Sequence, residues 1–111
     1  MLRRFALLAA AVMALAGGGM GIATAAPPVT LGGGSGITLG DGGQDMYDCT
    51  LTTIGNDASG RLVGLTAAHC GLPGMTVKAE YDAAAGSVGR IVSANTVLDY
   101  AVIEFDRGKV V

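Results

Sequence analysis

The sequence has few of the side chains that hold metal ions or bind nucleic acids. It contains one histidine, two cysteines and only seven lysines and arginines in 111 residues. A metal site needs three or four converging ligands, and His69 and Cys70, being adjacent, do not easily turn toward the same ion. No basic patch is present that would suggest a nucleic-acid partner. We therefore expect no metal cofactor and no nucleic-acid partner.

The first 25 residues have the pattern of a secretory signal peptide. Arg3 and Arg4 form a positive start, residues 5–16 an apolar run, and residues 23–25 (Ala-Thr-Ala) a small-residue cleavage site. The apolar run is short for crossing a bilayer. The alternative is an uncleaved membrane anchor over 5–26, but three consecutive glycines interrupt that segment. We expect a secreted, extracellular protein with no membrane attachment after cleavage, whose mature chain begins at Ala26.

The mature chain would be small and acidic. It carries five basic and nine acidic residues, a net charge of −4. A chain of about 86 residues builds only one small core, so a covalent cross-link would help its stability. Cys49 and Cys70 can form only one intramolecular disulfide in an oxidising compartment. Closing a loop of this length contributes about 3 kcal/mol through the entropy of the unfolded chain.

Two regions of different composition follow the predicted signal peptide. Seven of the twelve residues over 32–43 are glycine, so we expect a flexible leader over 26–44, in which 37–39 could form a short strand. From Tyr47 onwards, short apolar or alternating runs are separated by turn residues, and no stripe of helical spacing occurs. Strands are expected over 47–54, 61–66, 75–81, 87–94 and 100–105, with a tight turn over 67–71. This spacing predicts an all-β domain over 45–111, a small antiparallel barrel or sandwich.

A histidine works as a general base when one ring nitrogen donates to a fixed acceptor and the other faces the proton to be removed. His69 follows an apolar run, and Asp99 stands at the start of the last predicted strand, where rigid backbone could hold an ionised carboxylate. The other acidic residues lie in turns, on polar faces or in the leader. His69 and Asp99 are therefore the candidate catalytic pair.

These residues carry a resemblance to a known family. The sequence Leu-Thr-Ala-Ala-His-Cys over 65–70 resembles the histidine motif of chymotrypsin-like (trypsin-like) serine endopeptidases, and Asp-Tyr-Ala-Val-Ile over 99–103 resembles their aspartate motif. The motifs occur in the family's order, and the thirty-residue interval from His69 to Asp99 is most similar to the bacterial streptogrisin-type branch. The resemblance covers roughly residues 47–105.

The resemblance implies the first barrel of a two-barrel fold and hydrolysis of peptide or protein substrates. His69 would act as general base and then acid, Asp99 would orient its ring, and a serine would attack the peptide carbonyl beside an oxyanion hole. It also implies that Cys49 pairs with Cys70. No cofactor is implied, and the glycine cluster lacks the Gly-Lys-Ser/Thr ending of a phosphate-binding loop.

The sequence departs from the family at the nucleophile. After Asp99 there is no serine, threonine or cysteine, and the four serines of the sequence all precede it. They are Ser35 in the leader and Ser59, Ser87 and Ser93 in turns or strands. We expect none of them to act as the nucleophile. In the family the serine and the specificity pocket belong to a second barrel, so we expect this chain to be an incomplete domain, inactive alone and prone to self-association through an exposed barrel face.

Two other interpretations stay open. The chain could be an exported non-catalytic β-domain that keeps a protease-like scaffold for binding or structure, or the product of a decayed reading frame. His69 alone, outside this set of residues, would be read as an ordinary structural histidine.

Overall fold

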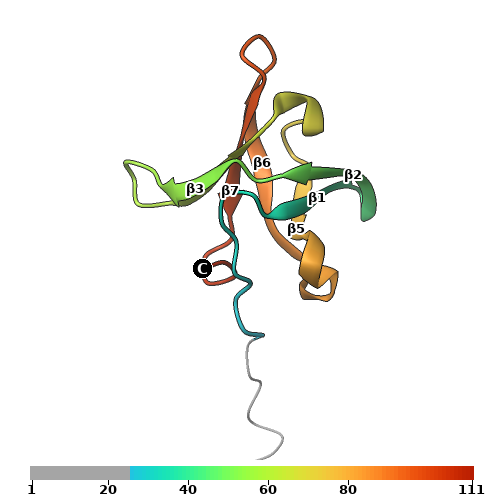
Figure 1. The fold of residues 1–111 in the computed structure, drawn as a ribbon, viewed down its shortest axis with the longest axis vertical. Helices are drawn as coiled ribbons and strands as arrows, with labels where there is room; N and C mark the ends of the chain where they lie inside the picture. The colour runs from blue at the N-terminus through green and yellow to red at the C-terminus, as the bar shows by residue number, and fades with distance from the viewer. Residues whose placement is uncertain (1–25) are drawn as a thin grey trace, which may run out of the picture.

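Seven strands and two short 3-10 helices make up residues 26–111, the part of the chain that the computed structural model describes (Figure 1). In chain order they are β1 (Gly36–Asp41), β2 (Gln44–Thr50), β3 (Thr53–Asn56), β4 (Leu62–Thr66), η1 (Ala68–Cys70), β5 (Thr76–Ala79), η2 (Glu80–Ala85), β6 (Ser87–Asn95) and β7 (Tyr100–Phe105). The strands form one antiparallel sheet in the order β2-β1-β5-β6-β7-β4-β3. The predicted all-β class is confirmed. The predicted signal peptide lies outside the described residues.

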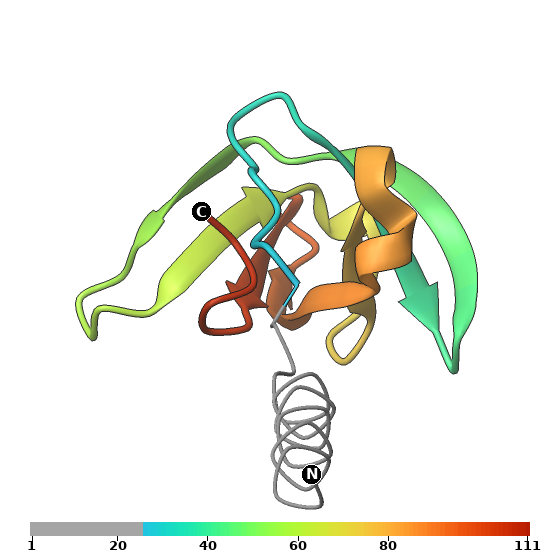
Figure 2. The ribbon, with the colours of Figure 1, turned by 90° about the horizontal axis from the view of Figure 1, so that it is seen from below.

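The sheet is strongly curled but is not a closed barrel. Its two edge strands, β2 and β3, are successive segments of the chain, joined by Leu51 and Thr52 (Figures 1 and 2). The Leu51 N–H donates to the Ser35 carbonyl near β1, whereas the Thr52 N–H donates to the Leu65 carbonyl in β4. The chain therefore changes its pairing partner between these two residues. This change also explains why the single strand expected over 47–54 is two strands.

The flexible leader expected over 26–44 was wrong as a description of this segment. It contains β1, which pairs with both β2 and β5 in the sheet. Further upstream, Val29 makes a parallel bridge with Val110 and is buried. The neighbours supply the hydrogen bonds and contacts that a glycine-rich segment lacks by itself. The short strand that the sequence allowed over 37–39 is present and extends over Gly36–Asp41, with Ile37 and Leu39 fully buried.

One apolar core fills the inside of the curl. Its largest fully buried side chains are Ile37, Leu39, Leu51, Ile91, Ile103, Val77 and Val88. Burial of a side chain of this size contributes about 1.5 to 3 kcal/mol. The predicted alternation over 75–81 is confirmed as far as Ala79, but Tyr81 is exposed because the chain has entered η2. The strand predicted over 100–105 has the bounds of β7. The core thus holds the ends of β4 and β7, where the candidate residues lie.

Candidate functional site

His69 is presented to solvent by the short helix η1. The residues on either side of it, Ala68 and Cys70, are buried, while its own side chain is 74% exposed. A 3-10 helix has three residues per turn, so one turn can bury two neighbours and point the residue between them outward. The turn is closed by a hydrogen bond from the Cys70 N–H to the Ala67 carbonyl at 3.1 Å. The tight turn predicted over 67–71 therefore corresponds to η1.

Asp99 lies in the turn between β6 and β7 and has an unusual backbone. Its φ is 56°, and it is the one non-glycine residue with a positive φ within residues 26–111. Such a conformation is unfavourable for a residue with a Cβ and persists when the surroundings impose it. The turn is held by Asn95, whose side-chain oxygen accepts hydrogen bonds from the N–H groups of Val97 (3.1 Å) and Leu98 (2.9 Å).

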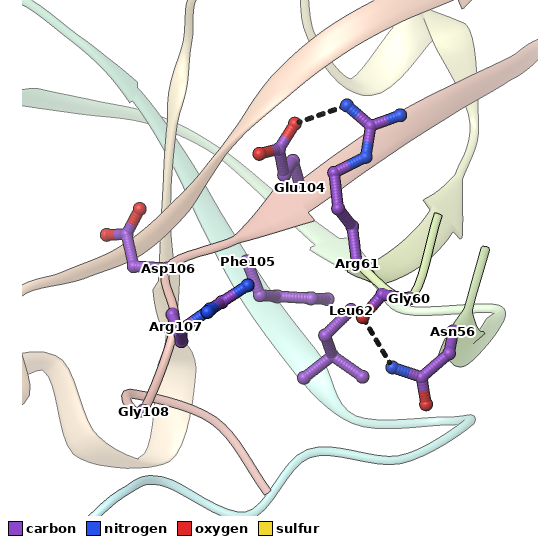
Figure 3. A pocket seen from close by; sticks show the side chains of 9 residues that line it. All are labelled: Asn56, Gly60, Arg61, Leu62, Glu104, Phe105, Asp106, Arg107 and Gly108. Atoms are coloured by element: carbon purple, nitrogen blue, oxygen red, sulfur yellow. Dashed lines mark hydrogen bonds and ion pairs between the residues drawn. The ribbon is translucent and has the colours of Figure 1, made fainter. Parts of the chain in front are cut away.

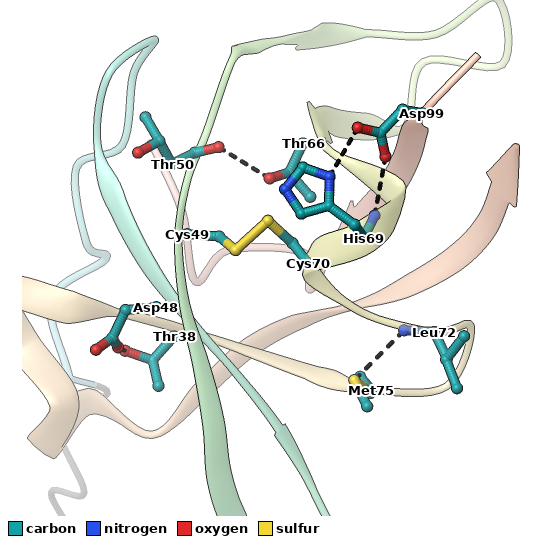
Figure 4. The surroundings of a disulfide bond; sticks show 10 residues. All are labelled: Thr38, Asp48, Cys49, Thr50, Thr66, His69, Cys70, Leu72, Met75 and Asp99. Carbon is teal, nitrogen blue, oxygen red and sulfur yellow. Dashed lines mark hydrogen bonds and ion pairs between the residues drawn. A yellow bond between two sulfur atoms is a disulfide. The ribbon is translucent and has the colours of Figure 1, made fainter. Parts of the chain in front are cut away.

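The structure brings His69 and Asp99 into direct contact, as predicted (Figure 4). Asp99 Oδ1 accepts the backbone N–H of His69 at 3.0 Å, and Asp99 Oδ2 lies 2.7 Å from His69 Nδ1. These two hydrogen bonds from His69, the backbone one first, hold the pKa of the Asp99 carboxyl below its ordinary value. An ionised carboxylate only accepts hydrogen bonds, so Nδ1 carries the proton. In the neutral ring, Nε2 is then a free acceptor, the state that a general base needs.

The pair is open to solvent. The Asp99 side chain is 48% exposed, less than that of His69, so solvent weakens the electrostatic part of their contact. Apolar side chains close to the pair in sequence are also exposed, namely Leu72, Val97, Leu98 and Tyr100. The pair and these neighbouring side chains therefore lie at the surface, where another molecule can reach them.

The predicted disulfide between Cys49 and Cys70 is present, with a Cα–Cα distance of 6.2 Å (Figure 4). It ties the end of β2 to η1, directly beside His69. On the other side of Cys70, Gly71 lies against the core: a Cβ there would meet Ile91 Cδ1 at 2.9 Å and Leu39 Cδ1 at 3.0 Å. The segment that carries His69 is thus fixed both by a covalent bond and by close packing.

No serine lies in position to act with His69. Ser35 Oγ accepts the N–H of Gly32 at 2.9 Å, and Ser87 Oγ donates to the Gly89 carbonyl at 3.1 Å. Ser35 also lines a pocket of about 360 Å³ with Glu80 and Tyr81, but no histidine lines this pocket. Within residues 26–111, no hydrogen bond joins a serine hydroxyl to His69.

Another pocket, of about 480 Å³, lies between the turn that joins β3 to β4 and the end of β7 (Figure 3). Neither His69 nor Asp99 lines it. Two cationic residues line it, namely Arg107 and Arg61, and Arg61 is paired with Asp57 at 2.9 Å and with Glu104 at 3.7 Å. The pocket is therefore not part of the site that His69 and Asp99 form.

The part of the chain that the structure describes holds no group of three or more histidine, cysteine, aspartate or glutamate residues that could bind a metal ion. Nor does any helix in residues 26–111 have the length and apolar character needed to cross a membrane. Sequence reasoning did not single out Asn95, which holds the turn of Asp99, or Thr66, the buried polar residue that precedes η1. The available signal for Asn95 was an asparagine directly before the turn that contains Asp99.

The comparisons with known proteins give no relative: no family model matches the sequence, and no curated protein or solved structure matches it either.

Proposed function

We propose that this chain supplies the histidine and the aspartate of a Ser-His-Asp triad in a secreted, trypsin-like serine endopeptidase. The observation that carries the proposal is the contact of both Asp99 carboxylate oxygens with His69, one at the backbone N–H and one at Nδ1. The strained backbone of Asp99 and the exposed ring of His69 add support. The choice of the trypsin-like family rests on the motif resemblance over 65–70 and 99–103.

In this mechanism His69 Nε2 takes the proton of a serine hydroxyl as its oxygen attacks the peptide carbonyl carbon. Asp99 keeps the ring in the required tautomer and stabilises the imidazolium that forms. His69 then gives the proton to the leaving amine, and a water molecule hydrolyses the acyl-enzyme in the same way. The serine and the oxyanion hole come from outside residues 26–111, since no serine hydroxyl within these residues is hydrogen-bonded to His69.

The exposed apolar residues flanking the pair support the same proposal. Leu72, Val97 and Leu98 are 63%, 90% and 71% exposed. We propose that the polypeptide carrying the serine covers them, because a general base works best where water is excluded and apolar surface of this kind favours an interface. In the absence of that polypeptide, the same surface favours self-association. The disulfide supports export to an oxidising compartment.

A serine-directed fluorophosphonate probe tests the proposal. The probe is applied to the natural secreted product, whose intact mass and sequence are determined in parallel. We expect labelling of a serine in a polypeptide that contains or binds this chain. Asp99→Asn should slow labelling by about 10⁴-fold, the loss typical when the orienting aspartate is removed. Absence of labelling in the complete secreted product would contradict the proposal.

A second candidate is an exported β-domain without catalytic activity. The absence of a serine in contact with His69 within residues 26–111 favours it. In that case the secreted product folds cooperatively and neither contains nor binds a serine-bearing polypeptide. His69→Ala then leaves its binding properties unchanged. Copurification of a serine-bearing polypeptide with this chain separates the two candidates in favour of the first.

A further inference from the structure

Thr66, the last residue of β4, is the one buried polar or charged residue within the described part of the chain. It is 2% exposed, and its hydroxyl donates a hydrogen bond to the Thr50 carbonyl at 2.9 Å. A buried hydroxyl at a sheet position is unfavourable relative to valine unless it is hydrogen-bonded. The fold thus satisfies a polar group at a place where an apolar residue of the same shape would fit.

Thr66 stands where the three segments that build the candidate site meet. Its hydroxyl reaches Thr50, the residue after Cys49. Its backbone is in register with Ala101 of β7, two residues after Asp99. Along the chain it is three residues before His69. Figure 4 shows the hydrogen bond to Thr50 and the disulfide as two neighbouring links between the same two segments.

We infer that Thr66 is a positioning residue, whose hydroxyl fixes the end of β4 against Thr50 and so holds His69 at the distance that Asp99 requires. The inference rests on the proposed function of the pair. The disulfide attaches to Cys70, after His69, whereas the Thr66 hydrogen bond acts before it. With only one of these links, η1 could still pivot about the other end. Both links together fix the direction of the His69 ring.

The test uses Thr66→Val, which replaces the hydroxyl by a methyl group of the same shape, and Thr66→Ser, which keeps the hydroxyl. The matched control is Thr76→Val, because the Thr76 hydroxyl also donates to a backbone carbonyl, that of Gly40 at 3.3 Å, in another part of the sheet. The readout is the ¹⁵N spectrum of the imidazole at a pH where the ring is neutral. His69 is the only histidine in the sequence, so its signals need no assignment.

In the wild-type chain we expect one imidazole nitrogen to carry the proton almost entirely, which separates the two ¹⁵N shifts widely. Thr66→Val should reduce this separation, as the ring leaves Asp99 and exchanges between tautomers, and should raise the pKa of the Asp99 carboxyl toward its ordinary value. Thr66→Ser should restore the wild-type spectrum, and Thr76→Val should not alter it. If Thr66→Val fails to fold, Thr66→Ala, which also lacks the hydroxyl, takes its place.

The outcomes separate this inference from the proposed function. A wild-type separation that Thr66→Val leaves unchanged overturns the positioning role of Thr66 and leaves the pair intact. An equal loss in Thr66→Val and Thr76→Val also overturns it, because the effect is then general loosening of the sheet. A wild-type chain without a fixed tautomer contradicts both, since there is then no oriented pair to position.

Discussion

Asp57 and Asp99 share a pattern of two contacts at two places in the molecule, and Asp57 also accepts the N–H of Ser59 at 2.9 Å. Each accepts a backbone N–H with one oxygen and a side-chain nitrogen with the other: Asp57 from Arg61 at 2.9 Å in both contacts, and Asp99 from His69 at 3.0 and 2.7 Å. In each case the backbone hydrogen bond is the largest cause of a lowered carboxyl pKa. The two carboxylates therefore make the same kind of contact, although the partner of Asp57 is a permanent cation and the partner of Asp99 is an imidazole.

The two aspartates differ in how far apart in the sequence their partners lie and in their backbone conformation. Asp57 binds a residue four positions later and closes the turn between β3 and β4. Asp99 binds a residue thirty positions away, with β5, η2 and β6 between them in the chain, and does so from a left-handed backbone conformation. A turn aspartate stabilises its own loop, whereas Asp99 accepts strain to reach His69. A long sequence separation between the bonded residues and a strained backbone at the aspartate, rather than the number of hydrogen bonds, therefore distinguish the candidate site from an ordinary turn.

The largest expected effect comes from removing the disulfide with Cys49→Ser and Cys70→Ser together. We expect the free energy of unfolding to fall by about 3 kcal/mol, from the entropy that the unfolded chain regains. The loss should also free η1, so that amide hydrogen exchange rises at His69 but not at Arg61. Urea unfolding and native-state exchange measure the two effects. Equal increases in exchange at both residues would erase the distinction between the two aspartate sites.

A smaller loss is expected from Gly71→Ala. The φ of Gly71 is 178°, which any residue can adopt, so the requirement for glycine is one of space. The added Cβ would meet Ile91 and Leu39 at 3.0 Å or less, and overpacking of this kind costs about 1 to 3 kcal/mol. Gly55→Ala in β3 is the control, since no atom lies within 4 Å of a Cβ there. Equal stability of the two variants in urea unfolding would contradict close packing behind His69.

Several features around His69 and Asp99 could be predicted from the sequence. The pairing of Cys49 with Cys70, the strand over 100–105 and the meeting of His69 with Asp99 were all predicted and found. Each rests on a simple property of the residues concerned: two thiols that can oxidise, a run of apolar residues, and a histidine that can donate to a carboxylate. The protease role that the resemblance implies stays a prediction.

The sequence failed where tertiary contacts decide the local structure. The glycine-rich region over 26–44 forms β1 because β2 and β5 supply partners on both sides, which composition alone does not reveal. The change of pairing at Leu51 and Thr52 likewise depends on which strands lie nearby. The left-handed backbone of Asp99 had no sequence signal beyond its place in a turn, because aspartate tolerates that conformation better than most residues do.

The smallest effect, and the most direct test of the comparison, is the response to acid. Both carboxyl groups have a pKa below the ordinary value of 3.8 in the folded protein, so each stabilises the fold when ionised and loses that contribution as the pH falls through its lowered pKa. Asp57→Asn and Asp99→Asn should each weaken the fall in stability below about pH 4, measured as the melting temperature against pH. No hydrogen bond within residues 26–111 links the two sites, so the changes should add in the double variant.

Only Asp99→Asn should also alter the tautomer of His69, because Asp57 makes no contact with the ring. A change in the His69 spectrum on Asp57→Asn would mean that the two aspartates belong to one coupled network, and the turn between β3 and β4 would then have to be counted as part of the site.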